Sequence, residues 1–354
     1  MTQIIWTFLI IISIVILFAV GFLLYGSFTE FKPASEVALQ LNGGNKNPLD
    51  TQTEFSFITW NLGYAGLGKE MDFFYDGGKG VRPSREDFDR YLEKIGWFIR
   101  QHDTVDFILL QEIDTCSKRS YHINEVTWMA SLLPEYCFSF GINYNSRFIP
   151  VPFFNPMGRV TSGVATFSVF RPLTATRVGF DNTISWPKRL YYFKRCFVVT
   201  HFGLPGDKEF LVVNVHNSAF DTGGILRQRE MENLSSYLRN EHEKGNFIVA
   251  GGDWNANPPG FEPGHITTGD RIKTDEFTSL DIFFPGWKFV ADPFLPTNRN
   301  VDKPYEIGVT PTTILDFFLV SPNVEILAVS TFPTLFEESD HQPVYLKVSL
   351  NPIP

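Results

Sequence analysis

The chain has 354 residues, of which 44% are hydrophobic, and this is enough apolar material for a large buried core. Its formal net charge of −9 argues against a partner bound through a broad basic face, such as long duplex nucleic acid, although a local basic groove stays open. The three cysteines are too few for a disulfide framework and form no CxxC pair typical of a zinc site. We expect them to be buried as small apolar residues, with one disulfide and a leftover thiol as the alternative.

The first predicted element is an N-terminal transmembrane helix over residues 4–25. No charged side chain occurs from Met1 through Phe28, and at about 1.5 Å per residue such a run spans a hydrocarbon core of roughly 30 Å. A cleaved signal peptide is the main alternative, but no basic region precedes the run and no A-x-A-like site follows it. The sequence therefore favours an uncleaved anchor, with the membrane as a partner.

The charges around this helix give its expected orientation. No Lys or Arg precedes it, and Glu30, Lys32 and Glu36 follow it. A cationic amino terminus opposite a slightly acidic flank favours a single-pass protein whose main domain lies on the non-cytoplasmic side. Residues 32–53 are predicted to be a linker, and residues 54–350 to form the catalytic domain.

Downstream of the linker, short β-rich runs alternate with helical patterns, which favours a layered α/β architecture. Several runs are continuously apolar, as is typical of strands buried on both faces. One helix is predicted over Ser84–Arg100, with Ser84 and Asp87 as its capping pair, and another over Gly224–Lys244. The predicted strands are Phe55–Trp60, Phe107–Gln111, Gly163–Phe170, Phe210–Val215, Phe247–Gly251, Ile314–Val320 and Val344–Leu350.

Polar side chains recur at the ends of these predicted strands. Each one alone could be a turn residue, a cap or an edge charge. Together they supply the oxygen and imidazole groups that a hard metal ion and a phosphoryl group require, and ligands of α/β sheets gather at strand ends. We therefore interpret them as one candidate site. The eight residues are Asn61, Glu112, His216, Asp253, Asn255, Asp316, Asp340 and His341.

The strings around these residues resemble the endonuclease/exonuclease/phosphatase superfamily, which includes DNase I-like nucleases, inositol polyphosphate phosphatases and neutral sphingomyelinases. The combination of GDxN with a later SDHxP, and with N and QE upstream, is a specific signal, and the resemblance covers roughly residues 54–350. The matching strings are Thr59-Trp-Asn-Leu62, Leu110-Gln-Glu-Ile113, Asn214-Val-His216, Gly251-Gly-Asp-Trp-Asn255, Leu315-Asp-Phe-Phe318 and Ser339-Asp-His-Gln-Pro343.

This resemblance implies a fold and a metal site. The fold would be a four-layer α/β/β/α sandwich of two mixed β-sheets flanked by helices, preceded here by the one transmembrane helix. By family role, Glu112 would bind the catalytic divalent cation, Mg²⁺ or Mn²⁺, with Asn61 and Asp340 beside it. Magnesium prefers oxygen ligands and keeps several waters, so one or two carboxylates are enough to hold it.

The resemblance also implies catalytic roles. Asp253 would orient or deprotonate the attacking water, and Asn255 would help to hold it. His341, positioned by Asp316, would stabilise the developing charge, while His216 would contact the phosphate from the other side. Phosphoryl transfer depends mostly on positioning and charge stabilisation, which suits a site without a Ser or Cys nucleophile.

Three further features of the sequence each allow two interpretations. The Gly- and aromatic-rich stretch 62–78 is a mobile loop or a substrate lid near the metal. The apolar, Pro-rich segment 148–156 is a membrane-touching loop or a core-packed connection. Two basic pairs could receive a phosphate or an anionic headgroup, or could stay as solvated charges. These pairs are Lys188-Arg189 and Lys194-Arg195.

We predict a phosphodiesterase that acts on phospholipid headgroups, of phospholipase C or sphingomyelinase type, because the anchor would hold the domain near a bilayer. A membrane-anchored nuclease is the second hypothesis, and the acidic charge balance argues against it. A catalytically inactive interaction module is the third. It is disfavoured because Glu112 and Asp253 are both present. No obligate protein partner is predicted.

Overall fold

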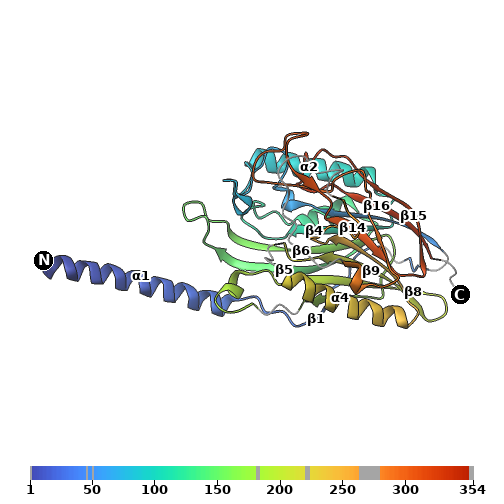
Figure 1. Cartoon of the computed structure of the whole chain (residues 1–354), viewed down its shortest axis with the longest axis horizontal. Coiled ribbons are helices and arrows are strands. Elements are labelled where there is room, and N and C mark those ends of the chain that lie inside the picture. The colour runs from blue at the N-terminus through green and yellow to red at the C-terminus, as the bar shows by residue number, and fades with distance from the viewer. Residues whose placement is uncertain are drawn as a thin grey trace.

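The computed structural model describes residues 2–44, 47–49, 52–180, 184–219, 224–262 and 280–350. In these residues two seven-stranded mixed sheets pack face to face and helices cover their outer faces, which gives four layers (Figure 1). The α/β/β/α sandwich with a preceding helix, as the sequence predicts, is confirmed. A short two-stranded ladder joins β12 (Asn298–Arg299) to β13 (Thr312–Thr313).

The first sheet has the spatial order β1-β7-β8-β9-β10-β14-β11. Strands β9 and β10 run parallel, and the other neighbouring pairs are antiparallel. The strands are β1 (Glu36–Ala38), β7 (Thr174–Gly179), β8 (Cys196–Leu204), β9 (Lys208–His216), β10 (Phe247–Asp253), β14 (Asp316–Val320) and β11 (Lys288–Val290).

The second sheet has the order β15-β16-β3-β4-β6-β5-β2. It too contains a single parallel pair, β3 with β4, among antiparallel neighbours. The strands are β15 (Val324–Thr331), β16 (Val344–Leu350), β3 (Glu54–Asn61), β4 (Phe107–Asp114), β6 (Gly158–Ser168), β5 (Cys137–Ile149) and β2 (Asn42–Gly43).

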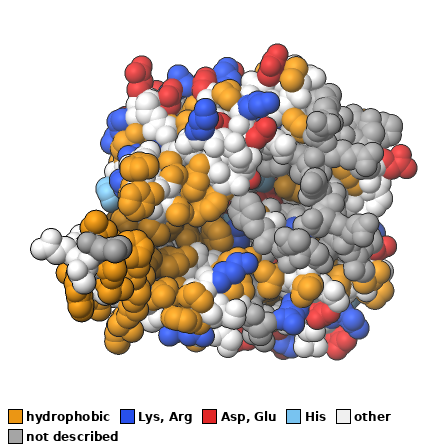
Figure 2. All heavy atoms as spheres, turned by 60° about the vertical axis from the view of Figure 1, so that its left-hand side comes forward, with side chains coloured by type: hydrophobic (Ala, Val, Ile, Leu, Met, Phe, Trp, Pro, Cys, Tyr) orange, Lys and Arg blue, Asp and Glu red, His pale blue; other side chains and the backbone are white. Residues whose placement is uncertain are grey.

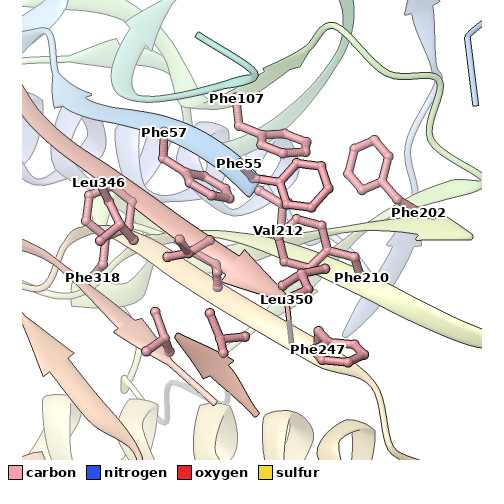
Figure 3. Close-up of a cluster of buried hydrophobic side chains, with 14 of the residues drawn as sticks. Phe55, Phe57, Phe107, Phe202, Phe210, Val212, Phe247, Phe318, Leu346 and Leu350 are labelled. Atoms are coloured by element: carbon pink, nitrogen blue, oxygen red, sulfur yellow. The ribbon is translucent and has the colours of Figure 1, made fainter. Parts of the chain in front are cut away.

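A cluster of aromatic and aliphatic side chains fills the space between the two sheets (Figure 3). Phe57 and Phe107 stack with ring centroids 4.8 Å apart, and Phe210 of the opposite sheet meets Phe55 at 5.1 Å. All four rings are fully buried. Each buried Phe contributes roughly 1.5–3 kcal/mol relative to an exposed one, so the abundant aromatic residues do much to hold the sheets together.

The outer layers are helices with one apolar face. The predicted helix at Ser84 is α2 (Arg85–Gln101), and Ser84 caps it by accepting the backbone N–H of Asp87 at 3.0 Å. Helices α2 and α3 (Glu125–Leu132) cover the second sheet, while α4 (Ile225–Glu243) and η5 (Leu280–Phe283) cover the first. Both predicted helices are therefore confirmed, while α3 is an addition.

The N-terminal helix α1 (Thr2–Thr29) projects away from the sandwich (Figure 1). Among the described residues it is the one helix long and apolar enough to cross a membrane, with a mean hydropathy of 3.0 and none of that stretch buried. A signal sequence would share these properties. In the stretch predicted as a linker, β1 pairs with β7 and β2 pairs with β5, so this stretch contacts an edge of each sheet.

The cysteines form no disulfide. Cys137 and Cys196 are buried, and Cys116 is partly exposed. Burial raises the pKa of the Cys196 thiol to about 11, so it stays uncharged at neutral pH. The prediction of small buried apolar residues is thus confirmed for two of the three.

Candidate active site

The ends of neighbouring strands bring the eight predicted residues to one edge of the sandwich. Strands β3 and β4 carry Asn61 and Glu112, and β9 and β10 end at His216 and Asp253. Within the first sheet, Asp253 pairs with His216 on one side and with Asp316 of β14 on the other. Because parallel strands finish at the same edge of a sheet, their terminal side chains meet there.

The carboxylate of Asp253 lies at the centre of the group. Its Oδ2 accepts a hydrogen bond of 2.9 Å from Asn61 Nδ2 and lies 3.6 Å from His216 Nε2 and 3.9 Å from His341 Nε2. Its Oδ1 accepts the backbone N–H of Asn255 at 2.9 Å. Two hydrogen bonds, from the Asn61 side chain and from the Asn255 backbone, thus hold this buried carboxylate in place beside the two imidazoles.

Two residues of the site adopt a left-handed backbone conformation. Glu112 has a φ of 50° and Asn255 a φ of 48°. The Asn255 side chain is held in place because its Nδ2 donates to the backbone oxygen of Asn217 at 2.9 Å. Left-handed backbone is costly for a residue such as Glu and is concentrated at functional sites, where surrounding structure holds it.

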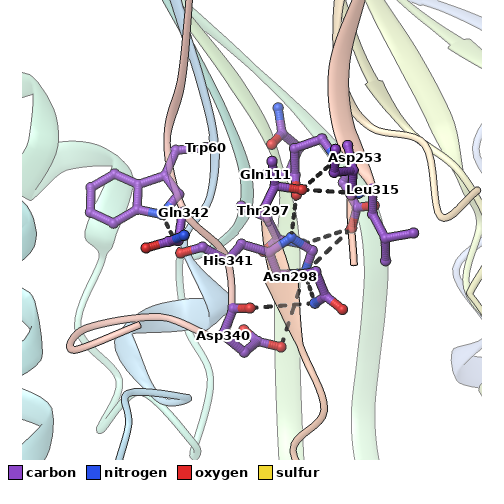
Figure 4. Close-up of polar contacts among 12 residues, drawn as sticks. Trp60, Gln111, Asp253, Thr297, Asn298, Leu315, Asp340, His341 and Gln342 are labelled. Carbon is purple, nitrogen blue, oxygen red and sulfur yellow. Dashed lines mark hydrogen bonds and ion pairs between the residues drawn. The ribbon is translucent and has the colours of Figure 1, made fainter. Parts of the chain in front are cut away.

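His341, which Figure 4 draws together with Asn298 and Asp340, forms a buried pair with Asp316 at one side of Asp253. Their Nδ1 and Oδ2 atoms are 2.7 Å apart, and the backbone N–H of Asp316 donates to Thr297 Oγ1 at 2.9 Å. Burial alone would lower the pKa of His341, but the carboxylates of Asp316, Asp253 and Asp340 outweigh it and raise that pKa to about 10. The ring therefore carries a proton at neutral pH.

His216 has the opposite protonation state. Its Nε2 lies 2.6 Å from the guanidinium of Arg195, whose plane also rests on the Phe193 ring at 4.2 Å. Burial first, and then the positive charges of Arg195 and His341, lower the pKa of His216 well below its ordinary value. A neutral His216 accepts a hydrogen bond from Arg195, so the two side chains form a buried basic corner of the site.

Carboxylates crowd the opposite side. Burial raises the pKa of Glu112, and the negative charge of Asp340 adds to this against the guanidinium groups of Arg119 and Arg195. Burial also raises the pKa of Asp340, with Asp253 adding to the shift. Buried carboxylates whose pKa is raised by a neighbouring negative charge are stabilised by a cation between them, so the donor set suits a hard divalent metal ion.

A second group of possible ligands overlaps this one. One ligand atom each of Asp253, Asp316 and His341 lies within 4.8 Å of the others. Asp316 and His341 already hydrogen-bond to each other, however, and a cation between them would have to break that contact. The side with Glu112 and Asp340 therefore suits Mg²⁺ better, because this ion prefers oxygen to imidazole.

Comparison with known proteins is consistent with this geometry. The model of the Endonuclease/Exonuclease/phosphatase family matches residues 58–341. The chain belongs to the Endonuclease/Exonuclease/phosphatase family. Enzymes of this family cleave phosphoester bonds, and the site therefore belongs to a phosphoesterase scaffold. Curated proteins include no match to the sequence.

Several solved structures share the fold. An endonuclease/exonuclease/phosphatase from Beutenbergia cavernae has a TM-score of 0.54 and 16% identity, over 86% of this chain and 73% of that one. TDP2 from D. rerio, solved with a single-strand DNA product, has a TM-score of 0.54 and 10% identity, over 84% of this chain and 100% of that one. ANGEL2, a 2′,3′-cyclic phosphatase, has a TM-score of 0.52 and 15% identity, over 89% of this chain and 98% of that one. At these identities the similarity establishes a common fold.

Some contacts of the family site in this chain were not predicted from the sequence. Asn298 places its side-chain amide 3.0 Å from His341 Nε2, but it lies in a loop-rich region without a recognisable motif. Arg195 was visible only as half of a basic pair. Gln111 and Asn214 stand inside the matching strings, and Gln111 Nε2 donates to Asn214 Oδ1 at 2.8 Å across the two sheets. The sequence contains no signal for this contact because it depends on how the sheets pack.

The stretch predicted as a mobile loop or lid is held in place by Arg299. It contains two short 3-10 turns, η1 (Gly63–Ala65) and η2 (Phe74–Asp76). The buried guanidinium of Arg299 donates to the backbone oxygens of Leu67 and Gly68 at 3.0 and 2.8 Å. Gly63 leaves room for the site, since a Cβ there would lie 2.8 Å from Asp340 Oδ1. These contacts favour a fixed wall beside the carboxylates over a mobile loop.

Proposed function

We propose that the protein is a divalent-metal-dependent phosphodiesterase, anchored in a membrane by α1, that hydrolyses phospholipid headgroups. The observation that carries the hydrolase part is the central position of Asp253. Its Oδ2 faces Asn61, His216 and His341 at 2.9, 3.6 and 3.9 Å. A fixed carboxylate between a protonated and a neutral imidazole fits the activation of water beside a phosphoryl group.

Glu112, Asp340 and the Asn61 oxygen would hold the cation. When bound, it would act as a Lewis acid on a phosphoryl oxygen. The crowding of negative charge supports this assignment, because burial and the charge of Asp340 raise the pKa of Glu112, and burial and the charge of Asp253 raise that of Asp340. Mg²⁺ and Mn²⁺ both accept such an oxygen set.

The chain's own groups account for the remaining steps. Asp253 accepts a proton from the attacking water, whose oxygen forms the new bond to phosphorus while the bond to the ester oxygen breaks. The ester oxygen leaves with the bonding electrons and takes up a proton from solvent, and Asp253 then releases its own proton to solvent. Asn255 helps to hold the water. The protonated His341 stabilises the charge that develops on the phosphoryl group, and Asp316 keeps it protonated. Arg195 donates to the phosphoryl oxygens from the opposite side, and the neutral His216, which accepts from Arg195, keeps the guanidinium in place.

The substrate class is supported by the position of the domain rather than by its site. Helix α1 has the length and hydropathy of a membrane anchor, and an anchored site meets phospholipid headgroups at high local concentration. We infer an N-terminus inside and a domain outside the cytoplasm from the charge pattern. A nuclease is the second candidate, favoured by the fold shared with TDP2, whose structure contains a DNA product. The assembled site argues against an inactive interaction module.

A substrate panel tests these candidates. The full chain in vesicles is given sphingomyelin, phosphatidylcholine, plasmid DNA, RNA and the soluble diester bis(p-nitrophenyl) phosphate, each with Mg²⁺, with Mn²⁺ and with EDTA. We expect headgroup release from a lipid, loss of this activity in EDTA, and loss in Asp253→Asn. Cleavage of DNA or RNA alone would support the nuclease. A folded protein without turnover, or turnover that survives both EDTA and Asp253→Asn, would contradict the proposal.

A further inference from the structure

The last turns of α1 pack against the catalytic domain. The Phe22 ring stacks on Tyr191 with centroids 5.6 Å apart, and Trp186 Nε1 donates to Ser27 Oγ at 3.1 Å. Gly26 permits this close approach, because a Cβ at this position would lie 2.9 Å from the Tyr191 hydroxyl. The direction of the helix is therefore fixed relative to the domain.

A buried carboxylate reinforces this docking directly after the helix. The Glu30 side chain is only 3% exposed and lies 3.3 Å from the amines of Lys32 and Lys194 and 3.4 Å from the Arg189 guanidinium. Burial would raise the pKa of Glu30, but hydrogen bonds from Lys194 and Lys32 lower it below its ordinary value. Several charged contacts of one buried group hold the chain more firmly than a single exposed pair does.

The length of α1 places this docked end at the membrane surface. Its 28 residues span about 42 Å at about 1.5 Å each, roughly 12 Å more than the hydrocarbon core of a bilayer. The surplus corresponds to about two turns, and the turns that contact the domain are the last ones. The cations around Glu30 would then lie at the level of the lipid headgroups, whose phosphates long Lys and Arg side chains can reach.

A second apolar element projects on the same side as α1. Figure 1 shows the tip of the β5–β6 hairpin extending from the sandwich in the direction of the helix, and Figure 2 shows apolar side chains grouped around the helix on this face. At the tip, Phe153 is 82% exposed and Phe154 is 96% exposed, and their rings meet edge to face at 5.2 Å. Of the two interpretations of segment 148–156, core packing therefore does not apply to these two rings.

The same hairpin connects this face to the active site. Within β5, the Tyr144 hydroxyl donates to the backbone oxygen of Tyr191 at 3.2 Å, and its ring lies 4.3 Å from that of Phe193. The backbone oxygen of the neighbouring Asn143 accepts the backbone N–H of Lys194 at 2.8 Å, and its side-chain Nδ2 lies 3.5 Å from His216 Nδ1. The segment that contacts α1 thus runs directly into the basic corner of the site.

We propose that Phe153 and Phe154 enter the membrane leaflet next to α1, so that the domain has two membrane contacts and a fixed orientation. The occupant of this surface is a lipid bilayer, since the two exposed rings project on the same side of the domain as a helix suited to that solvent. Two contacts prevent the domain from rotating about the helix, and they keep the β5 side of the active site toward the headgroups. The inference rests on the part of the proposed function that places α1 in a membrane.

Fluorescence quenching tests this surface without any enzyme assay. The full chain is reconstituted in vesicles of phosphatidylcholine and phosphatidylglycerol, with Phe154→Cys carrying an environment-sensitive fluorophore and Cys116→Ser removing the partly exposed native thiol. The matched control is Leu327→Cys, an exposed position on β15 at the opposite edge of the same sheet. For the fluorophore at residue 154 we expect a blue shift of the emission, and quenching by lipids that carry a nitroxide in the acyl chain. For the fluorophore at residue 327 we expect neither.

The outcomes separate the two proposals. Flotation of the protein with vesicles after a carbonate wash reports the insertion of α1. If the protein floats but the fluorophore at residue 154 is as exposed to water as the one at residue 327, the hairpin contact is overturned and the anchor stands. If the protein does not float, both are overturned. If activity toward a lipid is found, Phe153→Ser with Phe154→Ser should lower it and spare the soluble diester. Equal effects on both substrates would also contradict the inference.

Discussion

The two sheets make the same local structure at the active site and use it differently. Each contains one parallel strand pair among antiparallel neighbours, β3 with β4 in one sheet and β9 with β10 in the other. The first pair carries the amide of Asn61 and the carboxylate of Glu112, which remains 24% exposed. The second carries His216 and Asp253, which are almost fully buried. A shared backbone geometry therefore places the proposed metal ligands on one side and the proposed proton-handling groups on the other.

Side-chain hydrogen bonds join the two halves both in the site and beneath it. Asn61 Nδ2 donates to Asp253 Oδ2 at 2.9 Å in the site, and Gln111 donates to Asn214 at 2.8 Å beneath it. Each sheet therefore supplies only part of the candidate site. The site exists only where the sheets are packed in the correct register, and variants in each half should fail in different ways.

The largest effect is expected in the buried half. Asp253→Asn keeps the size of the side chain but removes the proton acceptor, so turnover of the best substrate should fall by about 10²–10⁴. Metal binding, measured by calorimetry with Mn²⁺, should persist because Glu112 and Asp340 are intact. The control Asp281→Asn, on the distant 3-10 turn η5, should leave turnover unchanged. Retained turnover in Asp253→Asn would remove the central residue from the mechanism.

A substitution at Glu112, in the half proposed to bind the metal, should instead lower the affinity for the metal ion. Loss of groups that merely surround a metal costs about 10–100-fold in affinity, and loss of the Glu112 carboxylate should cost at least as much. Glu112→Gln should therefore need more Mg²⁺ for half-maximal activity, and raising the Mg²⁺ concentration should restore part of the turnover. A variant with an unchanged Mg²⁺ requirement would show that Glu112 is not a ligand and would shift attention to Asp253, Asp316 and His341.

The His341–Asp316 pair predicts a pH effect of definite sign. Because the pKa of His341 is raised to about 10, the ring of the native protein keeps its proton until the pH approaches that value. Asp316→Asn removes the main cause, so the pKa should fall toward about 6.5 or lower. Turnover should then drop roughly tenfold or more at pH 8 and much less at pH 6.

A pH–rate profile of the variant and the native protein checks this effect. The expected result is an alkaline limb displaced to lower pH. Parallel profiles that differ only in height would mean that Asp316 acts through structure and not through the charge of His341.

The sequence predicts the parts of the site whose spacing is local. Strand ends followed by Asn61, Glu112 or Asp253 could be recognised because an apolar run stops at a polar side chain. The same reasoning could not find Asn298, which reaches His341 from a two-residue strand in a long Pro- and Gly-rich region. It also left Arg195 as one of four basic residues, because its contact with His216 depends on the pairing of β8 with β9.

The fold was predictable to a similar depth. Apolar runs marked strands buried on both faces, and the cap at Ser84 marked α2. Strand β5 was not predicted, since its inward and outward positions mix polar and apolar side chains beside a Pro-rich turn. The exposure of Phe153 and Phe154 could not be read from composition, because an apolar loop is equally compatible with a core. Strand β5 and the exposure of these rings depend on strand register and on the packing of the layers, which involve residues far apart in the sequence.

The smallest effect on activity is expected where the two halves touch beneath the site. Asn214→Leu removes the acceptor for Gln111 and the donor to the backbone oxygens of Leu110 and Ala165, all of them buried. Unsatisfied buried polar groups cost about 1–3 kcal/mol, so the free energy of unfolding, measured by urea denaturation in detergent, should fall by this amount.

A double-mutant cycle with Gln111→Leu decides whether the contact joins the sheets or only fills space between them. If the two side chains act as a pair, the double variant should be less destabilised than the sum of the single variants, by about 0.5–3 kcal/mol. Additive losses would mean that Gln111 and Asn214 do not act as a pair, and that the register of the two halves depends on the aromatic core and on the other polar contacts between the sheets, such as that of Asn61 with Asp253.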